Sequence, residues 1–205
     1  MRVSQPVGRF KGLVASLNGD GAHGWALAAV LALLLALHLA GPATVVALRY
    51  DRSALLAGEW WRLASAHLVH LDLRHTLLNG LGLILMWALF VRDYRARQWF
   101  LILVTSAAFI DAGLWFRDTG VQWYVGASGV LHGVMAAGVL AQLRRRELSG
   151  IVLGLFLIGK LVYEQTTGAL PFAGPSLPVV VDAHLYGVIG GAAMALCMRP
   201  QPVRL

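Results

Sequence analysis

The sequence predicts an all-α integral membrane protein built as a bundle of six transmembrane helices, and two observations support this prediction. Of the 205 residues, 58% are hydrophobic and 13% are charged, and the mean hydropathy is +0.68, whereas soluble domains contain about 45–50% apolar residues. In addition, six segments are apolar over much of the length that a helix needs to cross the hydrocarbon core, roughly 20 residues. These segments cover residues 22–40, 72–91, 99–115, 128–143, 150–162 and 179–198.

The sequence also indicates how the segments begin, how long they are and how they are connected. The first 20 residues are polar and basic and carry no cleavage site after a short apolar core, so we expect the first segment to stay attached. The fourth and fifth segments are short, which suits helices that other helices shelter from lipid. Long connections are expected at 41–71 and 166–178. The first of them contains the amphipathic run WWRLASAHLVH, which predicts an interfacial helix.

The distribution of positive charge predicts which side of the membrane each connection faces. Eleven of the 17 Lys and Arg residues lie in the N-terminal segment, the second and fourth connections and the C-terminal tail. Because positive charge stays in the cytoplasm, both termini should be cytoplasmic, which six spans allow. We therefore expect a cytoplasmic N-terminal segment at 1–21, a six-span domain at 22–198 and a cytoplasmic tail at 199–205.

The same composition argues against nucleic-acid binding and against an intrachain disulfide. The net charge of +7 is mostly a topology signal, and no basic patch interleaved with aromatic residues indicates nucleic-acid binding. Cys197 is the only cysteine, so the sequence has no pair that could form an intrachain disulfide.

The stretch YVGASGVLHGVMAA at residues 124–137 places the hydroxyl of Ser128 inside an apolar helix. A lone serine in a membrane helix usually hydrogen-bonds to its own backbone, and this interpretation stays open as the alternative. In the predicted orientation, however, Ser128, His75, Asn79 and His184 fall near the non-cytoplasmic ends of three spans. Polar side chains inside spans are costly and indicate a functional site. Small residues in the stretch let a second helix approach closely: Gly126, Ala127, Gly129 and Gly133.

These side chains permit nucleophilic catalysis. A serine nucleophile needs a base to take its proton and donors to hold the oxyanion. His184 can be that base, and Gly187 and Gly191, three and seven residues later on the same face, clear a groove for the fourth span. His75 and Asn79 lie four residues apart on the second span and project together as candidate oxyanion donors.

Three separated motifs resemble those of the rhomboid intramembrane serine proteases: EWWRLASAHLVHLDLRHTLLNG at 59–80, GASG at 126–129 and AHLYGVIGG at 183–191. They agree with that family in order and spacing over residues 25–198. The resemblance implies a catalytic domain at 22–198. The resemblance also implies that Ser128 is the nucleophile and His184 the general base of a dyad without an acid. It implies that His75 and Asn79 stabilise the oxyanion and that His70 is a structural histidine. Trp61 and Arg62 would brace the first loop outside the cytoplasm.

One residue departs from the typical rhomboid pattern. Four residues after the serine, rhomboids usually have a tyrosine on which the catalytic histidine stacks, whereas this chain has His132 in the string SGVLHG. That string resembles the rhombosortase branch. The branch implies the bacterial inner membrane and substrates whose C-terminal tail has a Gly-Gly motif, a hydrophobic helix and a basic cluster. If His132 stacks beneath His184, we predict that activity falls at low pH as His132 becomes protonated.

A histidine cluster offers a metal-binding alternative. His67, His70 and His75 are close in sequence and could ligate zinc. Their spacing is not HExxH and no Glu lies between them, so we predict neither a metal nor a cofactor.

The acidic residues near the candidate site receive plainer interpretations. Asp182 is two residues before His184 and points elsewhere on a helix, which favours a capping or first-turn role over membership of a triad. Asp111 lies in the third span without a partner that the sequence identifies. Glu164 follows the fifth span and is expected to be solvated.

Together these features predict an endopeptidase that cleaves membrane-anchored proteins in or near the non-cytoplasmic face of the lipid bilayer. The fifth span is expected to move aside to admit the substrate. One alternative is a catalytically inactive rhomboid-like protein that binds membrane helices. The other is a small transporter that uses the intramembrane histidines, which would predict inverted repeats that the sequence does not show.

Overall fold

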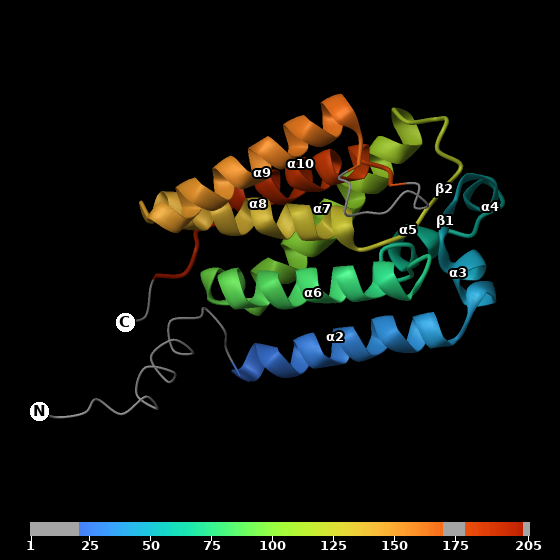
Figure 1. The fold of residues 1–205 in the computed structure, drawn as a ribbon, viewed down its shortest axis with the longest axis horizontal. Coiled ribbons are helices and arrows are strands. Elements are labelled where there is room, and N and C mark those ends of the chain that lie inside the picture. Colours follow the sequence, from blue (N-terminus) through green and yellow to red (C-terminus); the bar gives the residue numbers. More distant parts are fainter. Residues whose placement is uncertain (1–20, 170–178, 203–205) are drawn as a thin grey trace, which may run out of the picture.

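The structure, a computed structural model, describes residues 21–169 and 179–202, and its main helices follow the six predicted segments. The helices pack beside one another in a single bundle (Figure 1). They are α2 (Gly21–Leu39), α6 (Leu73–Phe90), α7 (Ala96–Phe116), α8 (Ser128–Arg144), α9 (Leu148–Thr167) and α10 (Asp182–Leu196). All but the last residue of the predicted cytoplasmic segment at 1–21, most of the connection at 166–178 and the last three residues of the predicted tail at 199–205 lie outside the described residues.

Not all of these helices are long enough to count as spans. Three of them, α6 together with η1 (Val91–Asp93), α7 and α9, are long and apolar enough to cross a membrane. A fourth candidate is α2 taken together with α3 (Pro42–Leu48), which is bent away from it by 112°. α8 and α10 have 17 and 15 residues, short of the roughly 20 that a full span needs. The structure therefore gives a helical integral membrane protein with three or four candidate spans, and it does not confirm six.

The prediction for the fifth segment is wrong in two respects. It ends the segment at residue 162, but α9 continues to Thr167 and includes Lys160 and Glu164, whose charges pair with each other at 2.5 Å. It also expects a sheltered helix, whereas only 17% of the apolar window of α9 is buried. The helix ends at Gly168, whose φ of +91° is in the left-handed region that favours glycine.

The centre of the bundle is α8, which packs against α6, α7, α9 and α10. Its closest neighbour is α10, because glycines face each other where the two helices meet. A Cβ on Gly187 would overlap the carbonyl of Gly129, and a Cβ on Gly191 would overlap the carbonyl of Gly133. Gly187 and Gly191 therefore let the two backbones come into direct contact.

The connection between α2 and α6 forms several short elements in place of one interfacial helix. After α3 come β1 (Tyr50–Asp51), α4 (Arg52–Leu56) and α5 (Arg62–Ser65). β1 pairs antiparallel with β2 (Trp123–Tyr124), with Tyr50 opposite Tyr124, so the chain is not purely helical. Each of the two strands is only two residues long, so the pattern of apolar residues does not predict them.

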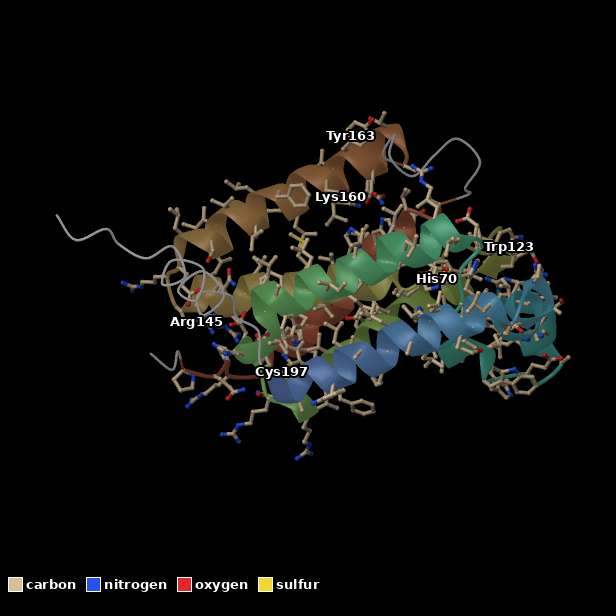
Figure 2. The ribbon with its side chains drawn as sticks, turned by 60° about the horizontal axis from the view of Figure 1, so that its bottom comes forward. His70, Trp123, Arg145, Lys160, Tyr163 and Cys197 are labelled. Carbon is tan, nitrogen blue, oxygen red and sulfur yellow. The ribbon has the colours of Figure 1, made fainter. Side chains whose placement is uncertain are left out.

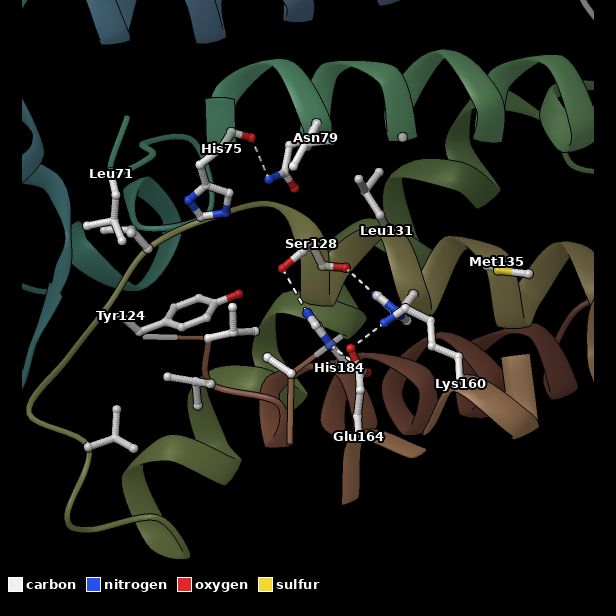
Figure 3. A pocket seen from close by; sticks show the side chains of 18 of the residues that line it. Leu71, His75, Asn79, Tyr124, Ser128, Leu131, Met135, Lys160, Glu164 and His184 are labelled. Atoms are coloured by element: carbon white, nitrogen blue, oxygen red, sulfur yellow. Dashed lines mark hydrogen bonds and ion pairs between the residues drawn. The ribbon is translucent and has the colours of Figure 1, made fainter. Parts of the chain in front are cut away.

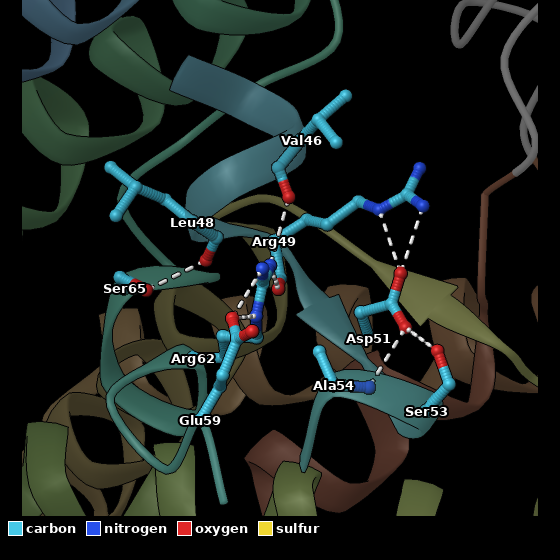
Figure 4. A network of polar contacts seen from close by, with 9 residues as sticks. All are labelled: Val46, Leu48, Arg49, Asp51, Ser53, Ala54, Glu59, Arg62 and Ser65. Carbon is cyan, nitrogen blue, oxygen red and sulfur yellow. Dashed lines mark hydrogen bonds and ion pairs between the residues drawn. The ribbon is translucent and has the colours of Figure 1, made fainter. Parts of the chain in front are cut away.

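Arg62 holds this connection together. Its side chain is buried and donates to the carbonyl oxygens of Val46 (2.8 Å) and Arg49 (3.0 Å), and it pairs with Glu59 (Figure 4). Trp61 is 55% exposed. Of the predicted bracing pair, the arginine therefore makes the contacts that tie α3 to α5.

The opposite end of the bundle carries a second polar network. Figure 2 shows Arg145 and Cys197 at this end and Trp123 at the other. Arg145 pairs with Asp93 at 2.7 Å, and the neighbouring Arg144 donates to the carbonyls of Ala195 and Met198 at the end of α10. Arginines near a helix C-terminus satisfy carbonyls that have no partner within the helix.

Candidate active site

Ser128 is the first residue of α8, and a fixed turn places it there. The hydroxyl of Tyr124 donates to the carbonyl of Gly126 (2.9 Å), and the Gly126 N–H donates to the carbonyl of Ala66 (2.9 Å). Gly126 has a φ of +115°, and a Cβ on it would lie 2.9 Å from the ring of His75. Glycine is therefore required for both the backbone conformation and the space.

His184 lies in the first turn of α10 and faces this serine. Its Nε2 is 3.0 Å from the Ser128 Oγ, and it is 5% exposed. The contact depends on the close packing of α8 and α10, because a Cβ on Gly129 would come within 2.8 Å of the Ala183 carbonyl oxygen. The structure thus brings together two side chains that are 56 residues apart in the chain.

The ring of His132 lies against the ring of His184. The two centroids are 4.1 Å apart and the planes differ by 15°, which is a stacked arrangement. His132 Nδ1 is 2.7 Å from the carbonyl oxygen of Ser128, one turn earlier on the same helix. A neutral ring with a proton on Nδ1 can donate this bond. His132 therefore supports the face of the His184 ring and is itself held by the backbone of α8.

The structure adds two residues that the sequence did not place at the site. Glu164 is 3% exposed, so the expectation that it is solvated is wrong. Its Oε2 is 2.9 Å from Nδ1 of His184, and its Oε1 is 2.5 Å from Nζ of Lys160, four residues earlier on α9. Figure 3 shows Glu164 and Lys160 reaching toward His184 from α9.

These residues line a cavity of about 670 Å³. Its walls come from α6, α8, α9 and α10 and from the segment before α8, and Ser128, His184, Lys160 and Glu164 all border it. Most of the other lining side chains are apolar: Leu71, Leu78, Leu85, Met86, Val121, Val125, Leu131, Met135, Phe156, Val179 and Val180. A largely apolar cavity with a few polar groups at one place is typical of a binding site.

His75 and Asn79 point into the same cavity from α6 (Figure 3). The Asn79 amide nitrogen donates one hydrogen bond to the carbonyl of His75 at 3.0 Å, which leaves its second N–H for another acceptor. The Asn79 Oδ1 and the His75 Nδ1 are buried without a hydrogen-bond partner among the described residues. Both side chains therefore face the site with unused hydrogen-bonding capacity.

His70 lies beneath the turn before α8. It is 2% exposed, its ring meets that of His75 edge to face at 4.9 Å, and its Nε2 lies 3.4 Å from the backbone N–H of Ala127, which donates to it. Burial, and secondarily the charge of His75, lowers the pKa of His70 to about 3. The neutral ring that results at pH 7 is the form that can accept from Ala127.

The predicted zinc alternative does not match the arrangement of the histidines. His67 is 3.4 Å from Asp111, which gives Asp111 the partner that the sequence did not identify. Among the residues that the structure describes, the side chains close enough to share a metal ion are instead His132, Glu164 and His184. Both ring nitrogens of His184 already have partners, and the lone pairs of His132 and His184 lie in two nearly parallel planes, so one ion cannot lie in the plane of both rings. This group is therefore poorly suited to a tetrahedral ion.

Asp182, the remaining acidic residue near His184, is the first residue of α10 and lies in its first turn, as predicted. A carboxylate there is favourable because the N-terminus of a helix carries partial positive charge.

A serine hydroxyl held against an imidazole, beside a cavity in a bundle of apolar helices, defines the class of the intramembrane serine hydrolases. Comparison with known proteins gives the family. The rhomboid domain matches residues 57–201, and the chain therefore belongs to the rhomboid family. Family and relatives identify it as an intramembrane serine protease.

Two relatives come from Bacillus subtilis (strain 168). The chain is 28% identical over 148 residues to YdcA, provisionally named a rhomboid protease, and the match covers 72% of each chain. It is 29% identical over 156 residues to the rhomboid protease GluP, a match that covers 75% of this chain and 29% of GluP. The chain thus spans less than a third of the length of GluP.

Proposed function

We propose that this protein hydrolyses a peptide bond of membrane-anchored protein substrates with Ser128 as nucleophile and His184 as general base. The observation that carries the proposal is the 3.0 Å contact between Ser128 Oγ and His184 Nε2 at the wall of the cavity. His184 takes the proton from the hydroxyl as Oγ attacks the carbonyl carbon, and a tetrahedral oxyanion forms. His184 then gives the proton to the leaving amine, and an acyl-enzyme remains.

Water completes the reaction at the same two residues. His184 takes a proton from water, the hydroxide attacks the acyl carbon, and Ser128 regains its proton as the carboxylic acid product leaves. The second N–H of Asn79, the ring of His75 and the backbone N–H of Ser128 are the donors that we assign to the oxyanion. Their support is that both side chains border the cavity, that Asn79 donates only one of its two amide N–H groups to His75, and that Nδ1 of His75 has no partner among the described residues.

Substrates enter, in this proposal, between α6 and α9, because both helices border the cavity. α9 is the element that we expect to open for the substrate and to close again before cleavage, since only 17% of its apolar window is buried. The bound segment must be extended at the cleaved bond, because the carbonyl groups within a helix are already hydrogen-bonded.

The proposed orientation has six spans, both termini in the cytoplasm and the active site near the non-cytoplasmic face of the bacterial inner membrane. Its support is the distribution of charge. Arg144 and Arg145 lie at the end of α8 opposite Ser128, and an excess of arginine is typical of cytoplasmic connections. Fusing a reporter active only outside the cytoplasm to each terminus tests the orientation, and activity of either fusion would contradict it.

For the substrate class, we propose proteins with a C-terminal tail that contains a Gly-Gly motif, a hydrophobic helix and a basic cluster. The observation that favours this class is the stack of His132 on His184, at the position where typical rhomboids have tyrosine. The test is the cleavage of two membrane-anchored reporters that differ only in the Gly-Gly motif. Equal cleavage of both reporters would contradict the rhombosortase interpretation and would indicate a general rhomboid protease.

The catalytic proposal is tested with a fluorophosphonate probe, which labels activated serines. We expect labelling of the folded protein, and its loss in Ser128→Ala and in His184→Asn. Labelling that survives Ser128→Ala would refute the assignment of the nucleophile. A folded protein that neither labels nor cleaves would favour the inactive helix-binding alternative, and ion flux through reconstituted liposomes would favour the transporter.

A further inference from the structure

We propose that Glu164 completes a Ser-His-Glu triad with Ser128 and His184, so that this protease works with a third residue and not with a dyad alone. The inference deepens the proposed function and rests on it. In this triad Glu164 is a positioning residue, because it acts on the substrate only through the imidazole of His184.

The contacts of His184 define the role of the carboxylate. Its two ring nitrogens face different partners, with Nδ1 at 2.9 Å from Glu164 Oε2 and Nε2 at 3.0 Å from Ser128 Oγ. An ionised carboxylate can only accept hydrogen bonds, so the proton of the neutral ring must be on Nδ1. The lone pair of Nε2 then faces the serine hydroxyl. Glu164 thereby selects the tautomer in which His184 can act as the base.

The carboxylate also contributes after the proton has moved. When His184 takes the proton of Ser128, the ring becomes an imidazolium with N–H groups at both nitrogens. The negative charge of Glu164 is 2.9 Å away and stabilises that cation. Because Glu164 is 3% exposed, little water screens the interaction. In serine proteases that use an aspartate, the acid acts in these same two ways.

Lys160 explains how a carboxylate can be ionised in such an apolar place. An isolated buried carboxylate would be costly, and a buried charge needs a partner. Lys160 is four residues earlier on α9, on the same helix face, and its Nζ contacts Glu164 Oε1 at 2.5 Å. The two carboxylate oxygens therefore have different partners, one for the counter-charge and one for the catalytic histidine.

The packing leaves His184 few alternative positions. His132 covers one face of its ring at 4.1 Å, and Glu164 holds the edge that faces away from Ser128. The stack limits tilting of the ring and the carboxylate limits rotation within its plane. A dyad would require the stack alone to perform both tasks.

The test uses Glu164→Gln, which keeps the size of the side chain and removes its charge. The assay is the rate of fluorophosphonate labelling of the full chain in detergent micelles. Loss of the equivalent charge in serine proteases lowers the rate by up to roughly 10⁴-fold, and we expect a loss of about 10²- to 10⁴-fold here. Glu147→Gln is the matched control, because Glu147 pairs with Arg145 at the far end of α8 and should label at the normal rate.

A double variant separates the triad from a simple charge imbalance. Glu164→Gln leaves Lys160 buried without its counter-charge, which alone could distort the site. Combining it with Lys160→Met removes both charges. If the rate stays low in the double variant, the carboxylate itself is needed; if the rate recovers, the triad is refuted.

A spectroscopic measurement reads the tautomer directly. In protein with ¹⁵N-labelled histidine, the Nδ1–H of His184 should give a proton resonance far downfield, typical of a hydrogen bond to a carboxylate. The resonance should persist in Ser128→Ala and disappear in Glu164→Gln. Its absence from the unsubstituted protein would overturn the proposal.

The failures are distinguishable. If Ser128→Ala labels normally, the proposed function itself is wrong. If Ser128→Ala is silent while Glu164→Gln labels at the full rate, the function stands as a dyad and the triad is refuted.

Discussion

The substitution Gly187→Ala should damage both stability and activity, because it acts on the contact between α8 and α10. A Cβ at this position would overlap the carbonyl oxygen and carbon of Gly129. These are backbone atoms at the start of α8, so no side chain can rotate away, and the helices must separate. Inserting a methyl group into a tightly packed site costs about 1–3 kcal/mol.

The effect on activity should exceed what this loss of stability explains. Gly187 is one turn after His184, and Gly129 directly follows Ser128, so separation here lengthens the 3.0 Å contact between the two side chains that we propose to be catalytic. A misplacement of about 1 Å can lower a rate roughly 10²-fold. We therefore expect a strong loss of fluorophosphonate labelling even at temperatures where the variant is folded.

Gly159→Ala is the matched control, since a Cβ at Gly159 in α9 would meet no atom within 4 Å. Replacing a helical glycine by alanine at such a position is expected to be neutral or to stabilise by up to about 1 kcal/mol. The assay compares thermal unfolding in detergent, followed by tryptophan fluorescence, with the labelling rate. If Gly187→Ala unfolds and labels like Gly159→Ala, the close packing of α8 on α10 does not position Ser128 against His184.

Three further predictions concern the segments outside the bundle. Arg62→Met should cost about 2–3 kcal/mol, because it leaves the carbonyls of Val46 and Arg49 without their charged donor, and Arg62→Lys should recover less than half of it, as thermal unfolding will show. The pKa of His70 is lowered to about 3 in the folded protein, so the folded state is favoured while the ring is neutral. This stabilisation is complete above about pH 6.5 and is lost as the pH falls toward 3. In His70→Asn, the unfolding midpoint should therefore depend less on pH between 7 and 4. The Ser53 hydroxyl is the main cause that lowers the pKa of Asp51 to about 2, with Arg49 contributing, so Asp51 stabilises the loop above about pH 4 and loses this effect as the pH falls through 2. In thermal unfolding, Asp51→Asn should therefore cost about 1 kcal/mol at pH 7 and progressively less as the pH falls from 4 to 2.

The positions of the main helices could be predicted because a membrane span depends on a simple property, its apolar length. All six predicted segments contain a helix, and the glycine pattern of α10 identified the face that meets α8. The number of complete spans is not confirmed, because α8 and α10 are short. Because α8 and α10 contact other helices over part of their surface, they need less contact with lipid and can be shorter than a full span. Composition alone does not show which segments are buried in this way.

The fine structure of the first connection was not predictable in the same way. Its two-residue ladder depends on β1 meeting β2, more than 70 residues later in the chain, at Tyr50 and Tyr124. Residues so far apart in the sequence are brought together only by the tertiary fold. The resemblance to rhomboids identified Arg62 but gave no reason for it, whereas the structure shows which carbonyls it satisfies.

Glu164 was missed for a physical reason that applies to other membrane enzymes. In sequence it lies near the end of an apolar segment, where charged residues usually meet water. Its spacing of four from Lys160 was a usable signal, because an opposite pair at this spacing on one helix face can be buried as a unit. Its spacing of 20 from His184 carries no information, since the two residues are on different helices. A search for i, i+4 pairs of opposite charge near the predicted ends of spans would have found this pair, and the contact with the histidine then follows only from the packing of α9 beside α10.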